Sequence, residues 1–220
     1  MSAKKVAVIL AGCGYLDGAE IRESVLTLLN LDTLGVSYEI FAPNTDQHHT
    51  INHVKGEEVS TKRNVMEEAA RIARGKIQPL NDLNIAEFAG IVFPGGFGVA
   101  KNLCTFAFQG SAGTTTEEVK RVIKGFHTEK KPIAAICIAP ALIALNLGEH
   151  KVNVTIGTDT ETAQEVEKTG ASHTNCEANE WCSDETNKVV STPAYMFDDA
   201  PLNKINEGIA GCLKQFSDWI

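Results

Sequence analysis

The hydrophobic positions of this chain follow two alternating spacings. Short apolar runs are typical of strands buried on both faces, and stretches with apolar residues on one helical face lie between them. The runs that predict strands are Lys5–Ala11, Ser37–Ala42, Ile77–Leu80, Gly90–Phe93, Pro132–Ile136, Val152–Ile156, Ser172–Asn175 and Lys188–Ser191. The spacing predicts helices at Ile21–Leu31, Thr61–Gly75, Thr116–Thr128, Ile138–Leu145, Thr160–Thr169 and Ala200–Ile220.

Strands that alternate with helices indicate a parallel sheet covered on both faces, as in a doubly wound α/β fold. We expect one such domain over residues 1–220, with 44–60 as an irregular polar segment. Sites in these sheets form beyond the carboxyl ends of the strands. The loops Gly12–Glu20 and Pro94–Asn102 and the junction at Cys137 should therefore meet there.

Cys137 lies where a predicted strand changes directly into a predicted helix. A tight turn of this kind presents its side chain beside the free N–H groups of the new helix. The helix dipole favours thiolate at such a position, so Cys137 is a candidate nucleophile on an elbow. The alternative is a buried cysteine that acts as a small hydrophobic residue.

Two features near this junction could support thiol chemistry. The glycines in Pro94–Gly98 would let backbone N–H groups approach a ligand, and the Ile138 N–H would add a second oxyanion donor. The alternative for this segment is a turn with positive φ and no ligand. Glu20 opens the first predicted helix and could exchange a proton with Cys137. An acidic residue in a first turn can also simply complement the helix dipole.

Other candidate site residues are polar side chains in loops and near strands. Asn102 could bind a substrate carbonyl or carboxylate, and His53 could reach the site from a loop near the sheet edge. His173 is the late histidine that could complete a Cys/His/acid arrangement, although nothing local fixes its direction. A solvated loop is the alternative for His53.

The composition narrows the classes of protein to consider. A net charge of −8 disfavours binding to nucleic acid or to an anionic membrane, and no apolar run approaches the length of a bilayer span. The six cysteines are scattered without a C-x-x-C pair, which argues against a disulfide framework and a structural zinc site. The apolar run Val6–Ala11 is too short for the core of a secretion signal, and we expect it to form a strand instead. We expect a cytoplasmic protein without a metal or cofactor.

Several motifs together resemble the ElbB family, the isoprenoid-biosynthesis ("enhancing lycopene biosynthesis") proteins with an amidotransferase-like domain. The matching segments are Val8–Glu20, Ile51–Gly56, Lys62–Val65, Glu68–Gly75, Phe93–Leu103, Cys137–Pro140, Thr155–Asp159 and Ser191–Met196. The family is in the PfpI-like branch of the class I glutamine amidotransferase-like superfamily. The resemblance implies a flavodoxin-like fold and a homodimer.

The resemblance also implies roles for particular residues. Cys137 would be the elbow cysteine, Glu20 its carboxyl partner, and Gly95, Gly96 and the Ile138 N–H the oxyanion region. The implied activity is a glutathione-independent glyoxalase reaction, in which small aldehydes such as methylglyoxal form a hemithioacetal with Cys137. Alanine and isoleucine flank Cys137 where glutamine amidotransferases have glycines, and Ser191–Tyr195 replaces their late His-Pro-Glu-like pair, which argues against glutaminase activity. Ile138 stands where PfpI-type proteases often have histidine, which argues against protease activity. The alternative function is a non-enzymatic redox or stress-response protein, or an ancillary protein of isoprenoid metabolism, with an oxidisable Cys137.

Overall fold

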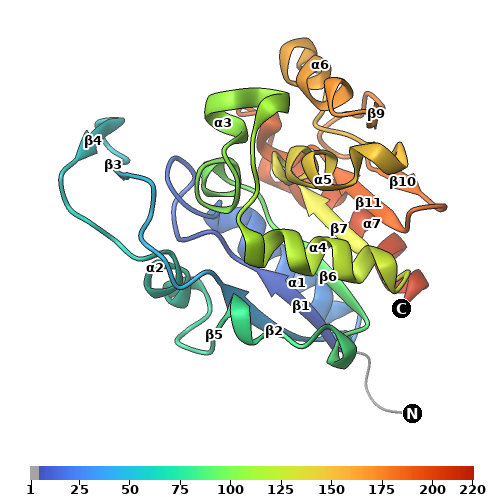
Figure 1. The fold of residues 1–220 in the computed structure, drawn as a ribbon, viewed down its shortest axis with the longest axis horizontal. Helices are drawn as coiled ribbons and strands as arrows, with labels where there is room; N and C mark the ends of the chain where they lie inside the picture. Colours follow the sequence, from blue (N-terminus) through green and yellow to red (C-terminus); the bar gives the residue numbers. More distant parts are fainter. Residues whose placement is uncertain (1–4) are drawn as a thin grey trace.

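Within residues 5–220, which the computed structural model describes, a seven-stranded sheet forms the centre (Figure 1). The strand order is β10-β11-β7-β6-β1-β2-β5, and all neighbours are parallel except β10 and β11. The strands are β1 (Lys5–Ile9), β2 (Ser37–Ala42), β5 (Gln78–Pro79), β6 (Gly90–Phe93), β7 (Ile133–Ile136), β10 (Cys182–Asp184) and β11 (Val189–Thr192). The expected doubly wound α/β fold is confirmed. The first four residues of the expected domain lie outside the described residues.

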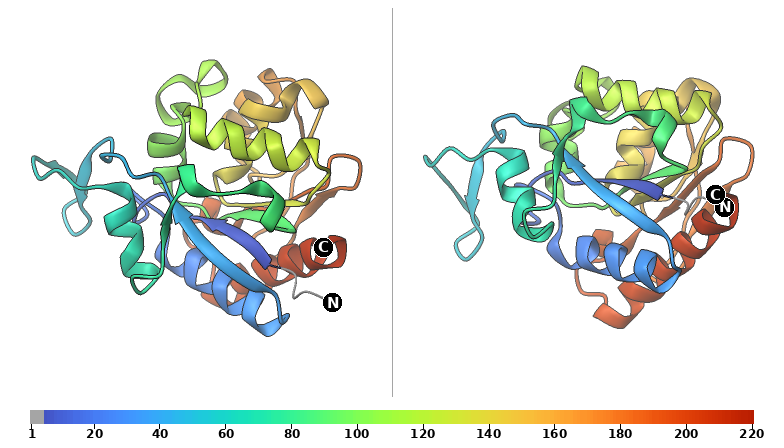
Figure 2. Two further views of the ribbon diagram at one scale, coloured as in Figure 1. Left: turned by 60° about the horizontal axis from the view of Figure 1, so that its bottom comes forward. Right: turned by 90° about the horizontal axis from the view of Figure 1, so that it is seen from below.

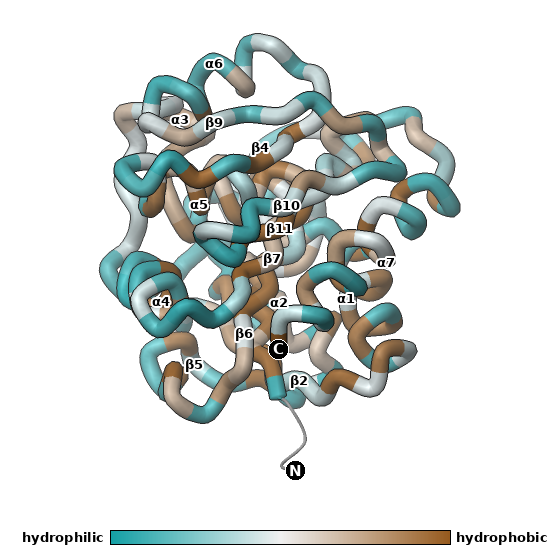
Figure 3. Tube along the Cα trace, turned by 90° about the vertical axis from the view of Figure 1, so that its right-hand side faces the viewer, coloured by the Kyte–Doolittle hydropathy of each residue, from teal (hydrophilic) through white to brown (hydrophobic). Residues whose placement is uncertain are grey.

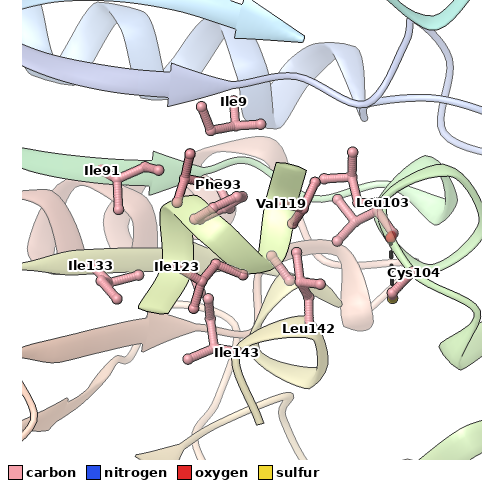
Figure 4. Close-up of a cluster of buried hydrophobic side chains, with 14 of the residues drawn as sticks. Ile9, Ile91, Phe93, Leu103, Cys104, Val119, Ile123, Ile133, Leu142 and Ile143 are labelled. Carbon is pink, nitrogen blue, oxygen red and sulfur yellow. Dashed lines mark hydrogen bonds between the residues drawn. The ribbon is translucent and has the colours of Figure 1, made fainter. Parts of the chain in front are cut away.

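Helices cover both faces of the sheet. Figure 2 shows α4 (Glu117–Thr128) and α5 (Ala139–Leu147) on one side, and α1 (Ile21–Thr33) and α7 (Leu202–Trp219) on the other. Successive strand residues point to opposite faces, so each strand contributes to two cores. Figure 4 shows one of them, where side chains of β1, β6 and β7 meet those of α4 and α5. Figure 3 shows the resulting pattern, with hydrophobic central strands and largely hydrophilic outer turns.

Smaller elements surround this framework. They comprise α2 (Val65–Ile72), α3 (Phe106–Gln109), α6 (Thr160–Lys168), the hairpin of β3 (Thr50–Asn52) and β4 (Glu57–Val59), and the pair β8 (Asn153–Val154) and β9 (Ser172–His173). The hairpin projects away from the sheet (Figure 1). Short 3-10 turns lie at Leu80–Asp82, Ile85–Glu87, Gly110–Ala112, Gly148–His150 and Ala194–Met196.

Some expected elements differ from those observed. The segment 44–60 contains the β3–β4 hairpin, although we expected it to be irregular. The run Val152–Ile156 supplies only the two-residue strand β8, which pairs with β9 outside the central sheet. Helix α2 begins at Val65 rather than Thr61, because the Asn64 side chain accepts hydrogen bonds from two amides of the first turn and caps the helix there.

Helix α1 buries three polar residues and leaves three apolar residues exposed. Glu23, Ser24 and Thr27 are fully buried, whereas Ile21, Val25 and Leu29 are 46%, 50% and 55% exposed. The apolar spacing thus predicted the helix correctly but did not identify its buried face. These three residues recur at every fourth position and form an exposed apolar stripe, which we call the α1 stripe.

Phe216 is a sensitive position in this fold, because α7 packs closely on β6 through it. A Cβ on Gly90 would lie only 2.6 Å from the fully buried Phe216 ring. We predict that Phe216→Ala lowers the free energy of unfolding by about 3–5 kcal/mol, since it leaves a large cavity. Urea denaturation measures the change. Lys214→Ala, on the exposed side of the same helix, should cost less than about 1 kcal/mol; equal losses would contradict this packing.

Candidate active site at Cys137

The backbone at Cys137 makes the tight turn that the sequence predicts. Strand β7 ends at Ile136, α5 begins at Ala139, and Cys137 between them has a φ of +64°. A non-glycine residue in this left-handed region costs about 1–2 kcal/mol, which surrounding contacts must offset. One such contact is the hydrogen bond of 2.9 Å from the Cys137 N–H to the Thr192 carbonyl of β11. The side chain is 7% exposed.

The glycine loop after β6 lies directly against this cysteine. A side chain on Gly95 would collide with Cys137 Cβ and would place its Cβ 2.5 Å from Glu23 Oε2. Gly96 has a φ of +100°, and its amide and that of Ile138 are close enough to the Cys137 sulfur to lower the pKa of the thiol. Of the three residues expected to form the oxyanion region, Gly96 and Ile138 thus have their amides beside the thiol, and Gly95 lies against Cys137 Cβ.

The carboxyl beside Cys137 belongs to Glu23, not to Glu20. Glu23 is fully buried, and its Oε1 accepts a hydrogen bond of 3.0 Å from the Tyr195 N–H. Among the described residues, its Oε2 has no partner with standard hydrogen-bond geometry. The Cys137 thiol and the Gly95 amide are nevertheless close enough to lower the pKa of the carboxyl.

The expected pairing of Glu20 with Cys137 is wrong for a simple geometric reason. Glu20 is the N-cap of α1, and its Oε2 accepts a hydrogen bond of 2.6 Å from the Glu23 N–H. Its carboxylate thus satisfies the free amides of its own helix, which is the alternative that the sequence left open. Glu23 lies nearly one turn later and points under the helix. The recurrence of Ala19, Glu23, Thr27 and Leu31 at every fourth position is the signal that could have identified it, since all four are fully buried.

Burial is the main cause of the raised pKa values of Glu23 and Cys137. It raises the pKa of Glu23 to about 8, and the nearby Glu20 charge adds to the rise. Burial, followed by the charge of Glu23, also raises the pKa of Cys137 well above its usual value, although the Gly96 and Ile138 amides oppose this. The Ile138 amide at the start of α5 thus favours the thiolate, as expected, but burial and Glu23 outweigh it in the free protein. Near pH 7 most molecules hold a proton on each group.

The other expected site residues have structural partners. Asn102 joins three loops, because its Nδ2 donates to the carbonyls of Ala11 and Asp17 and its Oδ1 accepts from the His48 N–H. His53 Nε2 accepts a hydrogen bond of 3.3 Å from the Leu16 N–H.

His173, the expected third member of the site, has a structural partner as well. Its Nε2 accepts a hydrogen bond of 3.1 Å from the Ile156 N–H, and burial lowers its pKa. These contacts hold loops and the β8–β9 pair in place, and none of them involves Cys137.

The segment Thr192–Tyr195 is part of the site, although we did not predict a role for it. The Thr192 carbonyl accepts a hydrogen bond from the Cys137 N–H, and the Tyr195 N–H donates one to the Glu23 carboxyl. Ala194 between them is fully buried with a φ of +43°, and the Arg22 guanidinium donates a 3.0 Å hydrogen bond to the Tyr195 hydroxyl.

Metal binding and membrane insertion receive no support from the part of the chain that the structure describes. No group of three or more His, Cys, Asp or Glu side chains there could hold a metal ion. No helix among residues 5–220 combines the length and the apolar character that a membrane span requires.

Comparisons with known proteins show what this chain is similar to. A family model described as "DJ-1/PfpI family" matches residues 4–192. The human "Glutamine amidotransferase-like class 1 domain-containing protein 3, mitochondrial" is 44% identical over 97% of this chain and 82% of its own length. The "ES1 protein homolog, mitochondrial" of Rattus norvegicus is also 44% identical, over 96% of this chain and 82% of its own.

A solved structure extends the agreement to the whole fold. The isoprenoid biosynthesis protein with amidotransferase-like domain from Ehrlichia chaffeensis has a TM-score of 0.92 and 38% identity, and the match covers 99% of each chain. This similarity confirms the resemblance drawn from the motifs. The expectation of a cytoplasmic location is wrong by the comparison with curated relatives, because both relatives above are described as mitochondrial.

The raised pKa of Glu23 should make stability depend on pH. Below pH of about 4.5 both the folded and the unfolded chain hold this proton; above it, only the folded chain does, up to about pH 8. The stability contributed by the protonated carboxyl is therefore lost as the pH rises from about 4.5 to 8. The Glu23→Gln variant does not titrate at this position. We predict that at pH 9 its free energy of unfolding exceeds that of the natural protein by on the order of a few kcal/mol.

Urea denaturation at pH 5 and pH 9 measures this difference. Glu165→Gln is a matched control, because Lys168 and Ser111 lower the pKa of Glu165 to about 2 and leave it ionised across this range. Its difference from the natural protein should stay constant between the two pH values. If the difference in unfolding free energy between Glu23→Gln and the natural protein also stays constant from pH 5 to pH 9, Glu23 is ionised in the folded state.

Proposed function

The chain belongs to the DJ-1/PfpI family, and on this premise we propose that it is a glutathione-independent glyoxalase that converts small 2-oxoaldehydes to 2-hydroxy acids. Methylglyoxal would give lactate and glyoxal would give glycolate. One observation carries the proposal: the fully buried Glu23, with a pKa of about 8, lies beside the Cys137 thiol. A group with a pKa near the working pH can both take and return protons, as the isomerisation of a 2-oxoaldehyde requires.

The reaction would begin with thiol addition. The ionised form of Glu23 takes the thiol proton while the Cys137 sulfur bonds to the aldehyde carbon. The carbonyl electron pair moves onto oxygen, and the Gly96 and Ile138 amides would stabilise the developing charge. Protonated Glu23 then returns its proton to this oxygen. The product is a neutral hemithioacetal, and Glu23 is again a carboxylate.

Proton transfer between the two carbons would complete the conversion. Glu23 removes the hydrogen from the former aldehyde carbon as a proton, which leaves an enediolate with its negative charge on the neighbouring oxygen. The proton of the first hydroxyl moves to that oxygen, and protonated Glu23 returns its proton to the neighbouring carbon. The result is a thioester of the 2-hydroxy acid on Cys137. Water then cleaves the carbon–sulfur bond, releasing the acid and restoring the thiol. The overall change adds one water and needs no external oxidant or reductant.

The electrostatics of the site favour this function over an oxidisable thiol. Oxidation by peroxide depends on thiolate character and on exposure. Cys137 is nearly buried, and its pKa is raised well above the usual value. A bound aldehyde, in contrast, needs the thiolate only during attack, when Glu23 can accept the proton.

The proposal predicts distinct effects for the two acidic residues of α1. Cys137→Ser and Glu23→Gln should each lower kcat/KM for methylglyoxal by about 100-fold or more, because they remove the nucleophile and the proton carrier. Glu20→Gln should stay within a few-fold of the natural protein, since its amide oxygen can still cap the helix. Proton NMR of lactate formation measures all three variants. In the natural protein the rate should rise with pH and level off above about 8.

Two results would overturn the proposal. One is the absence of lactate formation by the natural protein. The other is equal activity of Glu23→Gln and the natural protein, which would exclude the buried carboxyl as the proton carrier.

We also propose that the chain forms a homodimer through the α1 stripe. Homodimers are frequent in the DJ-1/PfpI family, and soluble monomers rarely expose aligned aliphatic side chains. Ile21, Val25 and Leu29 can meet the same stripe of an antiparallel second copy, because a two-fold axis near Val25 pairs Ile21 with the partner's Leu29.

Val25→Glu should convert the dimer to a monomer, because it puts two carboxylates together at the two-fold axis. Sedimentation velocity measures the mass. Gln164→Glu, which adds the same charge at an exposed position of α6, should leave the dimer intact. A monomeric natural protein, or a Val25→Glu variant that remains dimeric, would contradict the proposed interface.

A further inference from the structure

A concave surface that shares no residue with the Cys137 site is lined by residues of α1, β2 and α2 and of the segment that leads into β5. Figure 1 shows that β2, β5 and α2 meet at this edge of the sheet. The volume of the concavity is about 800 Å³, within the range of about 300–1,000 Å³ typical of ligand sites. It exists because β5 pairs with β2 only at Phe41 and Ala42, so that β5 does not cover the preceding part of β2. We call it the edge groove.

The floor of the edge groove is apolar and comes from three elements. Leu28 of α1, Tyr38 and Ile40 of β2, and Ile72 of α2 line it, together with Ile77 before β5. These side chains are partly or fully buried against the core on the α1 side of the sheet. The floor is therefore a fixed surface that an apolar body can cover without a rearrangement of the core.

The rim of the edge groove carries two cations that the protein does not neutralise. Arg74 and Lys76 are exposed, and neither side chain has an ion pair or hydrogen bond among the described residues. The carboxylate on this rim, Glu39, is occupied by Lys5 at 2.9 Å and by Gln78 at 3.0 Å. These two cations lie beside an apolar floor, although the chain as a whole carries a net charge of −8.

The turn that carries these cations is held in a defined shape. Arg74 has a φ of +53° and Gly75 a φ of +76°, which ends α2. The Gly75 N–H donates to the Ala70 carbonyl at 2.8 Å, and the Lys76 N–H donates to the Ala73 carbonyl at 3.0 Å. Arg74 and Lys76 thus start from fixed backbone positions, which lowers the ordering cost of binding an anion.

We propose that the edge groove binds a small amphipathic organic anion. Its aliphatic or aromatic body lies on the floor formed by Leu28, Tyr38 and Ile72. Its acidic head group, a carboxylate or a phosphate, pairs with Arg74 and Lys76. Charge-assisted hydrogen bonds to the head and burial of the apolar body contribute together, so neither half of the ligand should bind well alone.

The fluorescent probe 8-anilinonaphthalene-1-sulfonate, which has an aromatic body and an acidic head, tests this site. We expect saturable binding of the probe to the full chain. The double variant Arg74→Gln/Lys76→Gln should weaken the binding at least about tenfold. The matched control is Lys130→Gln/Lys151→Gln, which removes the same charge from two exposed residues outside the edge groove and should bind the probe as the natural protein does.

Competition distinguishes the ligand classes. Decanoate or decyl phosphate should displace the probe, and whichever displaces it at lower concentration identifies the preferred head group. Inorganic phosphate at the same concentration should not. Equal weakening in both double variants, displacement by inorganic phosphate alone, or failure of both decyl compounds to displace the probe would overturn the proposal. Cys137→Ser should bind the probe normally, since no residue of the edge groove belongs to the Cys137 site.

Discussion

The burial of one carboxyl group against one thiol is the constraint on which the rest of this structure depends. An isolated carboxylate in an apolar interior is costly, so Glu23 holds its proton to about pH 8 instead. The Tyr195 amide satisfies one of its oxygens, and the other is left facing the Cys137 thiol and Gly95. A protein selected only for stability would not retain this arrangement, because an apolar residue there would remove the cost.

Several backbone features are explained by this pair. Gly95 must lack a side chain, since a Cβ there would occupy the space between Cys137 and Glu23. Two non-glycine residues in the site, Cys137 and Ala194, have positive φ, and each is fixed by the neighbouring strand or turn. Strain concentrated at two residues on either side of a buried carboxyl is typical of a functional site rather than of a folding requirement.

The sequence predicts the framework well and the polar details poorly. The central strands from Gly90–Phe93 to Lys188–Ser191 and the elbow at Cys137 are recognisable because continuous apolar runs and a direct strand-to-helix junction are strong local signals. Glu20 and Glu23 are not separable in this way, since both are acidic residues in the first turn of one helix. Which of them caps the helix and which turns inward depends on tertiary contacts with Gly95 and Tyr195. The β3–β4 hairpin is equally hidden, because its short polar strands bury little apolar surface.

The rotation of helix α1 about its own axis determines both the position of Glu23 beside Cys137 and the exposure of the α1 stripe. If the helix turned about its axis to bury Ile21, Val25 and Leu29, the hydrophobic effect would favour the monomer, but Glu23 would leave Cys137. The observed rotation keeps the carboxyl in place and leaves the apolar residues in water. The exposure of these three aliphatic side chains to water is unfavourable in a monomer, because nothing there removes their apolar surface from water. In the proposed dimer, a second copy would cover the α1 stripe, so association and the position of Glu23 would depend on the same orientation of the helix. Contacts at the interface would then hold the helix at the rotation that the thiol chemistry requires.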